Sequence, residues 1–189
     1  MSTVEVAVRY LIDAKRSKFT VKAFATGLLS ALGHSPTIAI PDFEGNVSLT
    51  PDDLTQSSLR VVIPSASLNV IDDIKEKDRQ EINRAMRDEV LESDAYPDIV
   101  YECSKVSASK LGEDQFQVTL NGDLTLHGVT QNEPVSARVW LNGDTLRAAG
   151  DFSARQSDYE IRPVSAAGGT IKLKDELKMS FDISARKQA

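Results

Sequence analysis

Apolar and polar residues alternate along the segment 116–127, and this alternation limits the possible fold more than any other feature of the sequence. Every second residue from Phe116 to Leu126 is apolar except Gly122, and the residues between them are polar. A period of two is typical of a strand that buries one face and exposes the other. Segments 135–141 and 177–184 repeat the pattern. The sequence therefore predicts antiparallel β-structure, with a bend or bulge at Gly122.

Shorter strand candidates fill most of the remaining chain and are joined by short turns. Segments 111–114, 142–144 and 174–176 carry the residues that favour turns. About eight to ten strands with short connections are the pattern of a barrel or a sandwich. The further strand candidates are 4–12, 18–24, 43–49, 59–64, 99–107, 146–154 and 170–174.

One segment, 72–92, is dense in charge and departs from the β pattern. Its apolar residues fall at the spacing of a helix face, and they are Ile82, Ala85, Met86, Val90 and Leu91. We predict one helix here, with Asp78 or an earlier aspartate as its N-cap. Such a helix would cover one end of a barrel or pack along it, with its charges forming a solvated face.

Composition narrows the function classes. The chain of 189 residues suits one domain spanning 1–189, and its net charge of −6 disfavours binding to a phosphate backbone. The single cysteine excludes an intrachain disulfide. No run approaches the roughly 18 apolar residues that span a bilayer, so stable membrane insertion is not expected. With Met1 as the true start, no secretory signal is visible and we expect a cytoplasmic protein.

Two histidines, His34 and His127, are the main candidates for chemistry. With one distant cysteine, they lack the short-range spacing of a zinc site. The sequence also lacks a nucleophile elbow, a Walker loop and a dinucleotide fingerprint. We therefore predict no enzymatic activity, no metal and no cofactor. Each histidine has two interpretations: it forms hydrogen bonds at a turn or strand end, or it contacts the polar head group of a ligand. Arg155 and Arg162 likewise either form surface salt bridges or bind an anionic head group.

Several short patterns occur together in a characteristic order. The most specific is Gly-Asp-Leu-Thr-Leu-His-Gly-Val-Thr at 122–130. The others are 10–13 followed by 17–21, Gly33-His34, 43–45, 63–68, 77–79, 96–99, 150–152 and 157–159. Over roughly residues 8–186 this set resembles the YceI-like family. The sequence departs from the family at Glu160, where glycine is frequent, and in a helix that looks longer, from Asp78 to Leu91.

The resemblance implies a fold and a binding function. The fold would be mainly β, an antiparallel lipocalin-like β-barrel of about eight strands with one inserted α-helix. Members are similar to carriers of polyisoprenoids or other long amphiphilic chains in an elongated apolar lumen, and several are dimeric. We therefore expect a lipid-like partner such as a polyisoprenoid, an isoprenoid quinone or a fatty-acid-like molecule. A homodimer through a sheet edge or the helix is a further expectation.

Three hypotheses follow. In the first, the barrel binds or transports an apolar chain, with His34, His127 and Arg155 near its head group. The predicted lumen residues are Phe43, Val47, Val118, Leu120, Leu124, Leu126, Phe152, Met179 and Phe181. In the second, the core is filled, and the protein is a structural or stress-related one whose helix or Trp140 meets a partner. In the third, it is an enzyme that uses His34 or His127.

Overall fold

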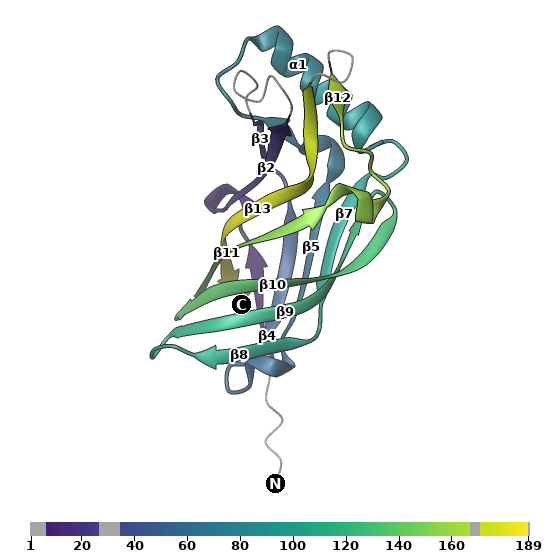
Figure 1. The fold of residues 1–189 in the computed structure, drawn as a ribbon. Helices are drawn as coiled ribbons and strands as arrows, with labels where there is room; N and C mark the ends of the chain where they lie inside the picture. The colour runs from purple at the N-terminus through teal and green to yellow at the C-terminus, as the bar shows by residue number, and fades with distance from the viewer. Residues whose placement is uncertain (1–6, 27–34, 167–170, 189) are drawn as a thin grey trace.

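Long strands joined by short turns dominate the computed structural model, which describes residues 7–26, 35–166 and 171–188 (Figure 1). The strands are β1 (Val8–Ile12), β2 (Lys18–Thr26), β3 (Thr37–Ala39), β4 (Glu44–Leu49), β5 (Ser58–Pro64), β6 (Asn69–Val70), β7 (Asp98–Cys103), β8 (Val106–Lys110), β9 (Gln115–Leu126), β10 (Val129–Asn142), β11 (Thr145–Arg155), β12 (Ser165–Ala166) and β13 (Ile171–Lys187). The helical segments are α1 (Glu76–Ala85), its π-helical continuation η4 (Met86–Val90), and the short 3-10 turns η1 (Ala14–Arg16), η2 (Leu54–Gln56), η3 (Ser65–Ser67) and η5 (Gln156–Tyr159).

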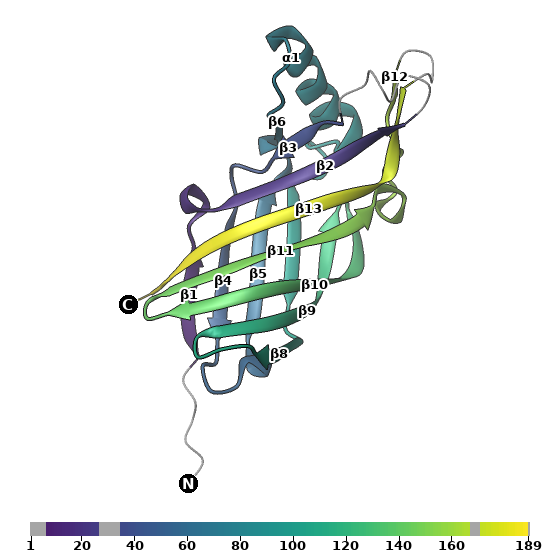
Figure 2. The ribbon, with the colours of Figure 1, turned by 60° about the vertical axis from the view of Figure 1, so that its left-hand side comes forward.

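Eight of the strands close into an antiparallel barrel, in the order β1-β4-β5-β7-β9-β10-β11-β13 and back to β1. The ring closes where Tyr10 and Ile12 of β1 lie opposite Lys187 and Ala185 of β13. In Figure 2, β9, β10, β11, β13 and β2 run obliquely across one side of this barrel. The predicted fold, an antiparallel barrel of about eight strands with one inserted helix, is confirmed.

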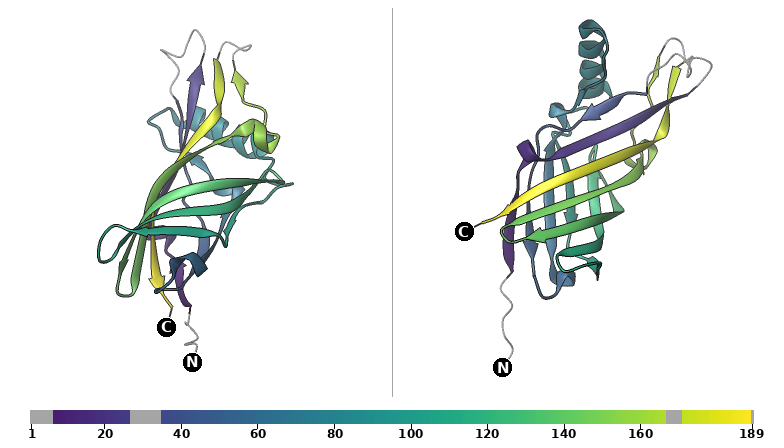
Figure 3. Two further views of the ribbon diagram at one scale, coloured as in Figure 1. Left: turned by 60° about the horizontal axis from the view of Figure 1, so that its bottom comes forward. Right: turned by 90° about the vertical axis from the view of Figure 1, so that its left-hand side faces the viewer.

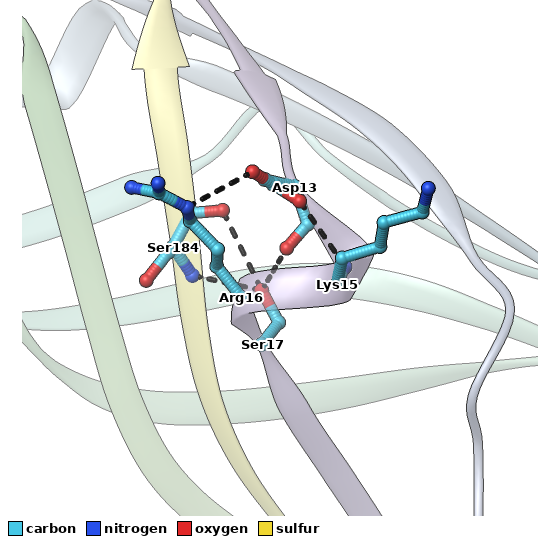
Figure 4. Close-up of polar contacts among 5 residues, drawn as sticks. All are labelled: Asp13, Lys15, Arg16, Ser17 and Ser184. Atoms are coloured by element: carbon cyan, nitrogen blue, oxygen red, sulfur yellow. Dashed lines mark hydrogen bonds and ion pairs between the residues drawn. The ribbon is translucent and has the colours of Figure 1, made fainter.

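The sheet changes partners at the junction between β1 and β2, which η1 separates (Figure 4). β13 pairs with β1 on one side of this junction and with β2 on the other. The Ser17 hydroxyl donates to the Asp13 carbonyl at 2.7 Å and accepts from the Ser184 amide at 2.9 Å, while the Asp13 amide donates to the Ser184 carbonyl at 2.9 Å. Side-chain and backbone bonds thus keep β13 paired across the interruption, as buried backbone groups require.

Beyond that junction the upper end of the barrel, where α1 lies in Figure 1, is built differently from the lower end, where η2 lies. β2 continues past the ring and carries β3, which in turn pairs with β6. The right-hand view of Figure 3 places α1 beyond this end of the strands. The upper end therefore owes its closure to helical segments as well as to strand pairing.

The predicted helix covers that end, as the sequence indicated. The five residues of its predicted apolar face all line the interior beneath it. The predicted cap is wrong, because Lys75 occupies the N-cap position and makes no side-chain cap hydrogen bond. Asp78 instead lies in the first turn with Glu76, where carboxylates interact favourably with the positive end of the helix dipole.

Two local predictions need correction. Segment 174–176 is not a turn, because it lies within β13, whose register shifts between Leu173 and Leu177. The candidate 99–107 is two strands, β7 and β8, which pair in succession with β9. Around Gly122, β9 pairs in unbroken register with β10, but on its other side the register shifts by one residue between the pair Glu102–Asp123 and the pair Val106–Leu120. A Cβ atom at Gly122 would lie 2.5 Å from Cζ of Tyr101, so the glycine makes room for that ring.

Candidate ligand-binding lumen

The lower half of the barrel encloses a cavity of about 170 Å³, which we call the lower chamber. Inward-facing residues of the ring strands line it, and Leu54 of η2 and Leu49 of β4 lie in its lining near the lower end. Its walls are aliphatic and aromatic, with Ser57, Ser58 and Tyr101 as the polar residues among them. The Tyr101 hydroxyl is already engaged, because the carbonyl oxygens of Leu120 and Glu133 lie 3.2 and 3.0 Å away and share its one proton.

The upper half contains a larger cavity of about 430 Å³, the upper chamber. Its walls come from β2, β11 and β13 on one side and from β5, β7 and β9 on the other, and α1 and η4 form its roof. Met86 and Leu91 of the roof are each 8% exposed, whereas Ile82 is 41% exposed. The roof therefore combines well-packed residues with an apolar side chain that borders solvent.

The two chambers adjoin at a waist, which we define as the residues that line both of them. These are Phe19, Ile63, Ile99, Leu124 and Phe152. All five are apolar, so no charge or hydrogen-bonding side chain separates the chambers at this level. Apolar side-chain bulk alone therefore separates the two chambers, which together we call the lumen.

Polar side chains gather at the upper chamber. Asp78 and Glu81 of α1 line it together with Arg155 and Gln156, which lie where β11 passes into η5. Gln156 is 4% exposed, and its Nε2 donates to the Lys174 carbonyl at 2.9 Å. The lumen thus has an apolar lower end and a polar, partly charged upper end, an arrangement that suits an amphiphile.

All nine predicted lumen residues line a chamber. Five of them border the lower chamber alone, namely Phe43, Val47, Val118, Leu120 and Phe181. Leu126 and Met179 border the upper chamber alone. Leu124 and Phe152 belong to the waist. Their contact with a ligand stays a prediction, but their placement follows from the alternating register.

The predicted head-group residues are placed differently from one another. His34 lies outside the described residues. Arg155 is exposed and lines the upper chamber. The described residues that line the two chambers do not include His127, which sits with Gly128 in the tight turn between β9 and β10. Both have positive φ, 53° and 73°, the signature of a type I′ hairpin turn.

His127 instead holds together the segments beside the roof. Its Nε2 lies 2.7 Å from Oε2 of Glu92, and its Nδ1 lies 3.3 Å from the Tyr159 carbonyl. Its ring centroid is 4.4 Å from that of Tyr96. The segment that follows η4 is thereby attached to the β9–β10 turn and to η5. Of the two interpretations, the hydrogen-bonding one describes what His127 does in this structure.

A buried tyrosine in the lining of the upper chamber is hydrogen-bonded to a carboxylate behind that wall. Tyr159 is fully buried, and its hydroxyl donates to Oε2 of Glu133 at 3.2 Å. Burial raises the pKa of Glu133 above its ordinary value, with a smaller contribution from Asp158, although the Tyr159 hydrogen bond opposes the shift. Burial also raises the pKa of Tyr159. Both groups therefore favour their protonated forms more than they would in water.

Several residues that shape the lumen were missing from the sequence-based set. Phe19, Ile63 and Ile99 lie in predicted strands and narrow the waist. The alternation around Phe19 could have placed it inward, but its depth along the barrel depends on strand pairing. Asp78 and Glu81 are exposed, as expected for a solvated face, and they also border the upper chamber because α1 lies across its end.

The described part of the chain contains neither a candidate metal cluster nor a helix suited to crossing a membrane. Over 7–26, 35–166 and 171–188, no group of three or more His, Cys, Asp or Glu side chains is placed to hold a metal ion. No helix among the described segments is long and apolar enough to cross a membrane.

Comparison with known proteins connects this geometry to a family. Residues 10–185 match the model of the YceI-like domain. Burkholderia cenocepacia BcnA shares 19% identity at a TM-score of 0.69, covering 92% of this chain and 98% of its own. A polyisoprenoid-binding domain from Saccharophagus degradans, implicated in plant cell wall breakdown, shares 16% identity at a TM-score of 0.71, covering 95% and 98%. The Campylobacter jejuni YceI protein shares 18% identity at a TM-score of 0.60, covering 80% and 85%. A search of curated protein sequences gave no significant match.

Proposed function

Because this chain belongs to the YceI-like family, and because its barrel encloses an apolar lumen, we propose that it binds a long apolar or amphiphilic molecule without chemical conversion. The observation that carries the proposal is the pair of adjoining chambers, of about 170 and 430 Å³, in the middle of a closed barrel. Natural cores are packed with few voids larger than a water molecule, so a lumen of this size indicates binding.

The shape of the lumen favours an extended chain. β9 has 12 residues, which corresponds to about 40 Å of strand and, at a barrel tilt near 40°, to roughly 30 Å along the barrel axis. Each methylene removed from water contributes about 0.8 kcal/mol, so about a dozen contribute roughly 10 kcal/mol before the entropic cost of binding. Apolar burial alone therefore suffices for stable binding.

The polarity of the lumen orients the ligand. The tail would occupy the lower chamber, and the head group would lie at the upper end beside Asp78, Glu81, Arg155 and Gln156. A polyisoprenoid, an isoprenoid quinone or a fatty-acid-like molecule has this form. The Saccharophagus degradans domain of similar fold is described as polyisoprenoid-binding, which supports the first of these classes for the present chain.

The first test is the content of the purified protein. Native mass spectrometry should detect a bound mass that organic solvent extracts as a lipid.

The second test narrows the lower chamber. Ala148 lines it, while the neighbouring Ala149 points to the other face of β11 and belongs to neither lining.

Ala148→Leu and Ala149→Leu therefore form a matched pair. The first substitution displaces the space of about two methylenes, so we expect it to weaken long-chain binding at least about tenfold. The second should change binding less than about twofold. Unfolding free energy should fall for neither by more than about 1 kcal/mol, because a pre-existing void accepts the larger side chain. A protein that is always empty, or equal effects of the two substitutions, would contradict the proposal.

Two alternatives account for fewer observations. A structural protein with a filled core requires an interior without space, which the two chambers contradict. In that alternative Trp140 would contact a partner, but the Arg147 guanidinium already lies over its ring, 5.2 Å from the centroid. A catalytic role for His127 would need a substrate within its reach, but its ring is engaged with Glu92 and Tyr159 outside the lumen.

A further inference from the structure

The waist is the narrowest feature that any chain must pass to occupy the whole lumen. Two of its residues form one wall, since Ile63 of β5 and Ile99 of β7 lie opposite each other in the pairing of these strands. Isoleucine is branched at Cβ and has few χ1 rotamers, so this wall is stiff. The opposite wall includes Phe19 and Phe152.

Phe19 is held by other aromatic rings. It contacts Phe43 edge-on at a centroid distance of 6.1 Å and Phe181 at 6.2 Å. Phe181 is itself fixed, because its Cζ lies 2.9 Å from the position that a Cβ of Gly150 would take. Moving Phe19 would therefore disturb a packed group of three rings and the glycine beside it.

Phe152 is the exception. It is partly exposed to the lumen and, among the described residues, it is in no aromatic contact. Its neighbours on the inner face of β11 are Ala148, Gly150 and Ala154, all small. Across the strand pair Phe152 faces Met179 of β13, whose side chain is flexible, so its ring can change rotamer more easily than one packed among other rings. Removing it would also open more space than any other change on this strand.

We infer that Phe152 determines the chain length that the lumen accepts, an inference that rests on the proposed function. A chain that enters from the upper end fills the upper chamber first and gains affinity with each methylene. At the waist, the next methylene requires the Phe152 ring to move, so the gain per methylene falls. Beyond the waist the chain reaches the lower chamber. Affinity plotted against chain length therefore has a break, and Phe152 sets its position.

The test uses the full-length protein and straight-chain primary alcohols of about 8 to about 20 carbons. Their affinities are measured by displacement of the fluorescent probe N-phenyl-1-naphthylamine. For the unchanged protein, affinity should rise roughly fourfold per methylene up to the break and less than about twofold per methylene beyond it. Phe152→Ala should move the break to chains longer by several carbons, and Phe152→Leu should move it by less.

Ser153→Ala is the matched control. Ser153 follows Phe152 on β11, but it is exposed on the other face of the strand and lines neither chamber. Its substitution should leave the break within about one carbon of its original position. Phe152→Leu keeps the test valid if Phe152→Ala does not fold, because it removes less of the side chain.

The outcomes distinguish the role of Phe152 from the binding of a chain by the lumen. A break at the same length in Phe152→Leu and the unchanged protein overturns the role of Phe152 and leaves chain binding intact. An equal shift in Ser153→Ala does the same. Absence of binding by folded protein at every chain length overturns the proposed function, and the role of Phe152 falls with it.

Discussion

The two chambers of the lumen are bounded in different ways, and this difference explains why one is larger and more polar. Around the lower chamber the barrel is a closed ladder of hydrogen-bonded strands, and the side chains of the ring largely fill it. Around the upper chamber the sheet extends through β2, β3 and β6, and helical segments complete the enclosure. A helix lying across the end of a barrel leaves more space than paired strands do, and it can carry charges at the rim.

The two halves of the barrel also differ in their expected contributions to folding stability and to ligand entry. Buried, regularly paired strands belong to the most stable part of a protein, whereas segments with exposed apolar side chains open more readily. Leu146 in the lower lining is 5% exposed, and Ile82 in the roof is 41% exposed. We therefore expect the lower half to supply most of the folding free energy and the roof to supply the entrance.

The largest expected effect is on the unfolding free energy, and it tests whether the lower half of the barrel contributes more to stability than the roof does. Leu146→Ala enlarges a cavity inside the closed ladder, so it should lower the unfolding free energy by about 3 kcal/mol. Ile82→Ala removes a half-exposed side chain and should lower it by less than about 1 kcal/mol. Urea denaturation at equilibrium measures both. Equal losses would mean that the roof is packed as firmly as the ladder.

The next effect concerns how the roof is attached. His127→Ala removes both hydrogen-bond contacts of the ring and its packing on Tyr96. We expect a loss of about 1–2 kcal/mol and faster amide hydrogen exchange in α1, η4 and 91–97, with exchange in β4 and β5 unchanged. Glu92→Gln keeps a hydrogen-bonding group opposite His127 and should have the smaller effect. Uniformly faster exchange over the whole barrel would show that His127 supports the ladder as well.

A pH experiment examines the wall of the upper chamber. The pKa of Glu133 is raised by burial, so the folded state binds its proton more tightly than the unfolded state does. Ionised Glu133 therefore destabilises the fold at neutral pH, and this penalty disappears as the pH falls below the ordinary value of 4.5. Glu133→Gln retains an acceptor for Tyr159 and should raise the melting temperature at pH near 7.

The expected gain from Glu133→Gln is below about 1 kcal/mol, because the carboxylate is partly exposed. At a pH of about 3 the variant and the unchanged protein should melt together, since this pH lies below the ordinary glutamate pKa of 4.5 and Glu133 is then largely protonated in both states. A difference that persists at this pH would trace the effect to packing around Tyr159 rather than to charge.

The sequence predicts the faces of the elements well because they depend on local periodicity. Alternation places Val118, Leu120 and Leu124 inward, and helical spacing places Met86 and Leu91 beneath the roof. The depth of a residue along the barrel is different, since it depends on the tilt and stagger of paired strands. For this reason the sequence could place Leu124, Phe152 and Met179 in the lumen, but it could not show that the first two border both chambers and the third only the upper one.

Tertiary contacts explain the failures more specifically. The charged segment 174–176 resembles a turn, but Asp175 accepts hydrogen bonds from the Ser157 amide at 2.8 Å and from the Ser157 hydroxyl. These bonds lower the pKa of Asp175 and hold the irregular stretch of β13 against η5. Because Ser157 is 18 residues away, no local pattern could reveal that the charges serve a strand irregularity.

The smallest effect belongs to Glu160, the position where the sequence departs from a frequent glycine of the family it resembles. Its φ is 59°, in the left-handed region, which is unfavourable for a residue with a side chain by about 1–2 kcal/mol. Glu160→Gly relieves this strain but gives the unfolded chain more freedom, so the net gain should be about 0.5 kcal/mol. Glu160→Ala retains the strain and should show no gain. Thermal unfolding of the three proteins measures this difference, and a gain in Glu160→Ala equal to that in Glu160→Gly would assign it to the lost charge. Glu160 directly follows Tyr159, which lines the upper chamber. A gain in Glu160→Gly alone would therefore show that a strained backbone conformation is present beside this chamber.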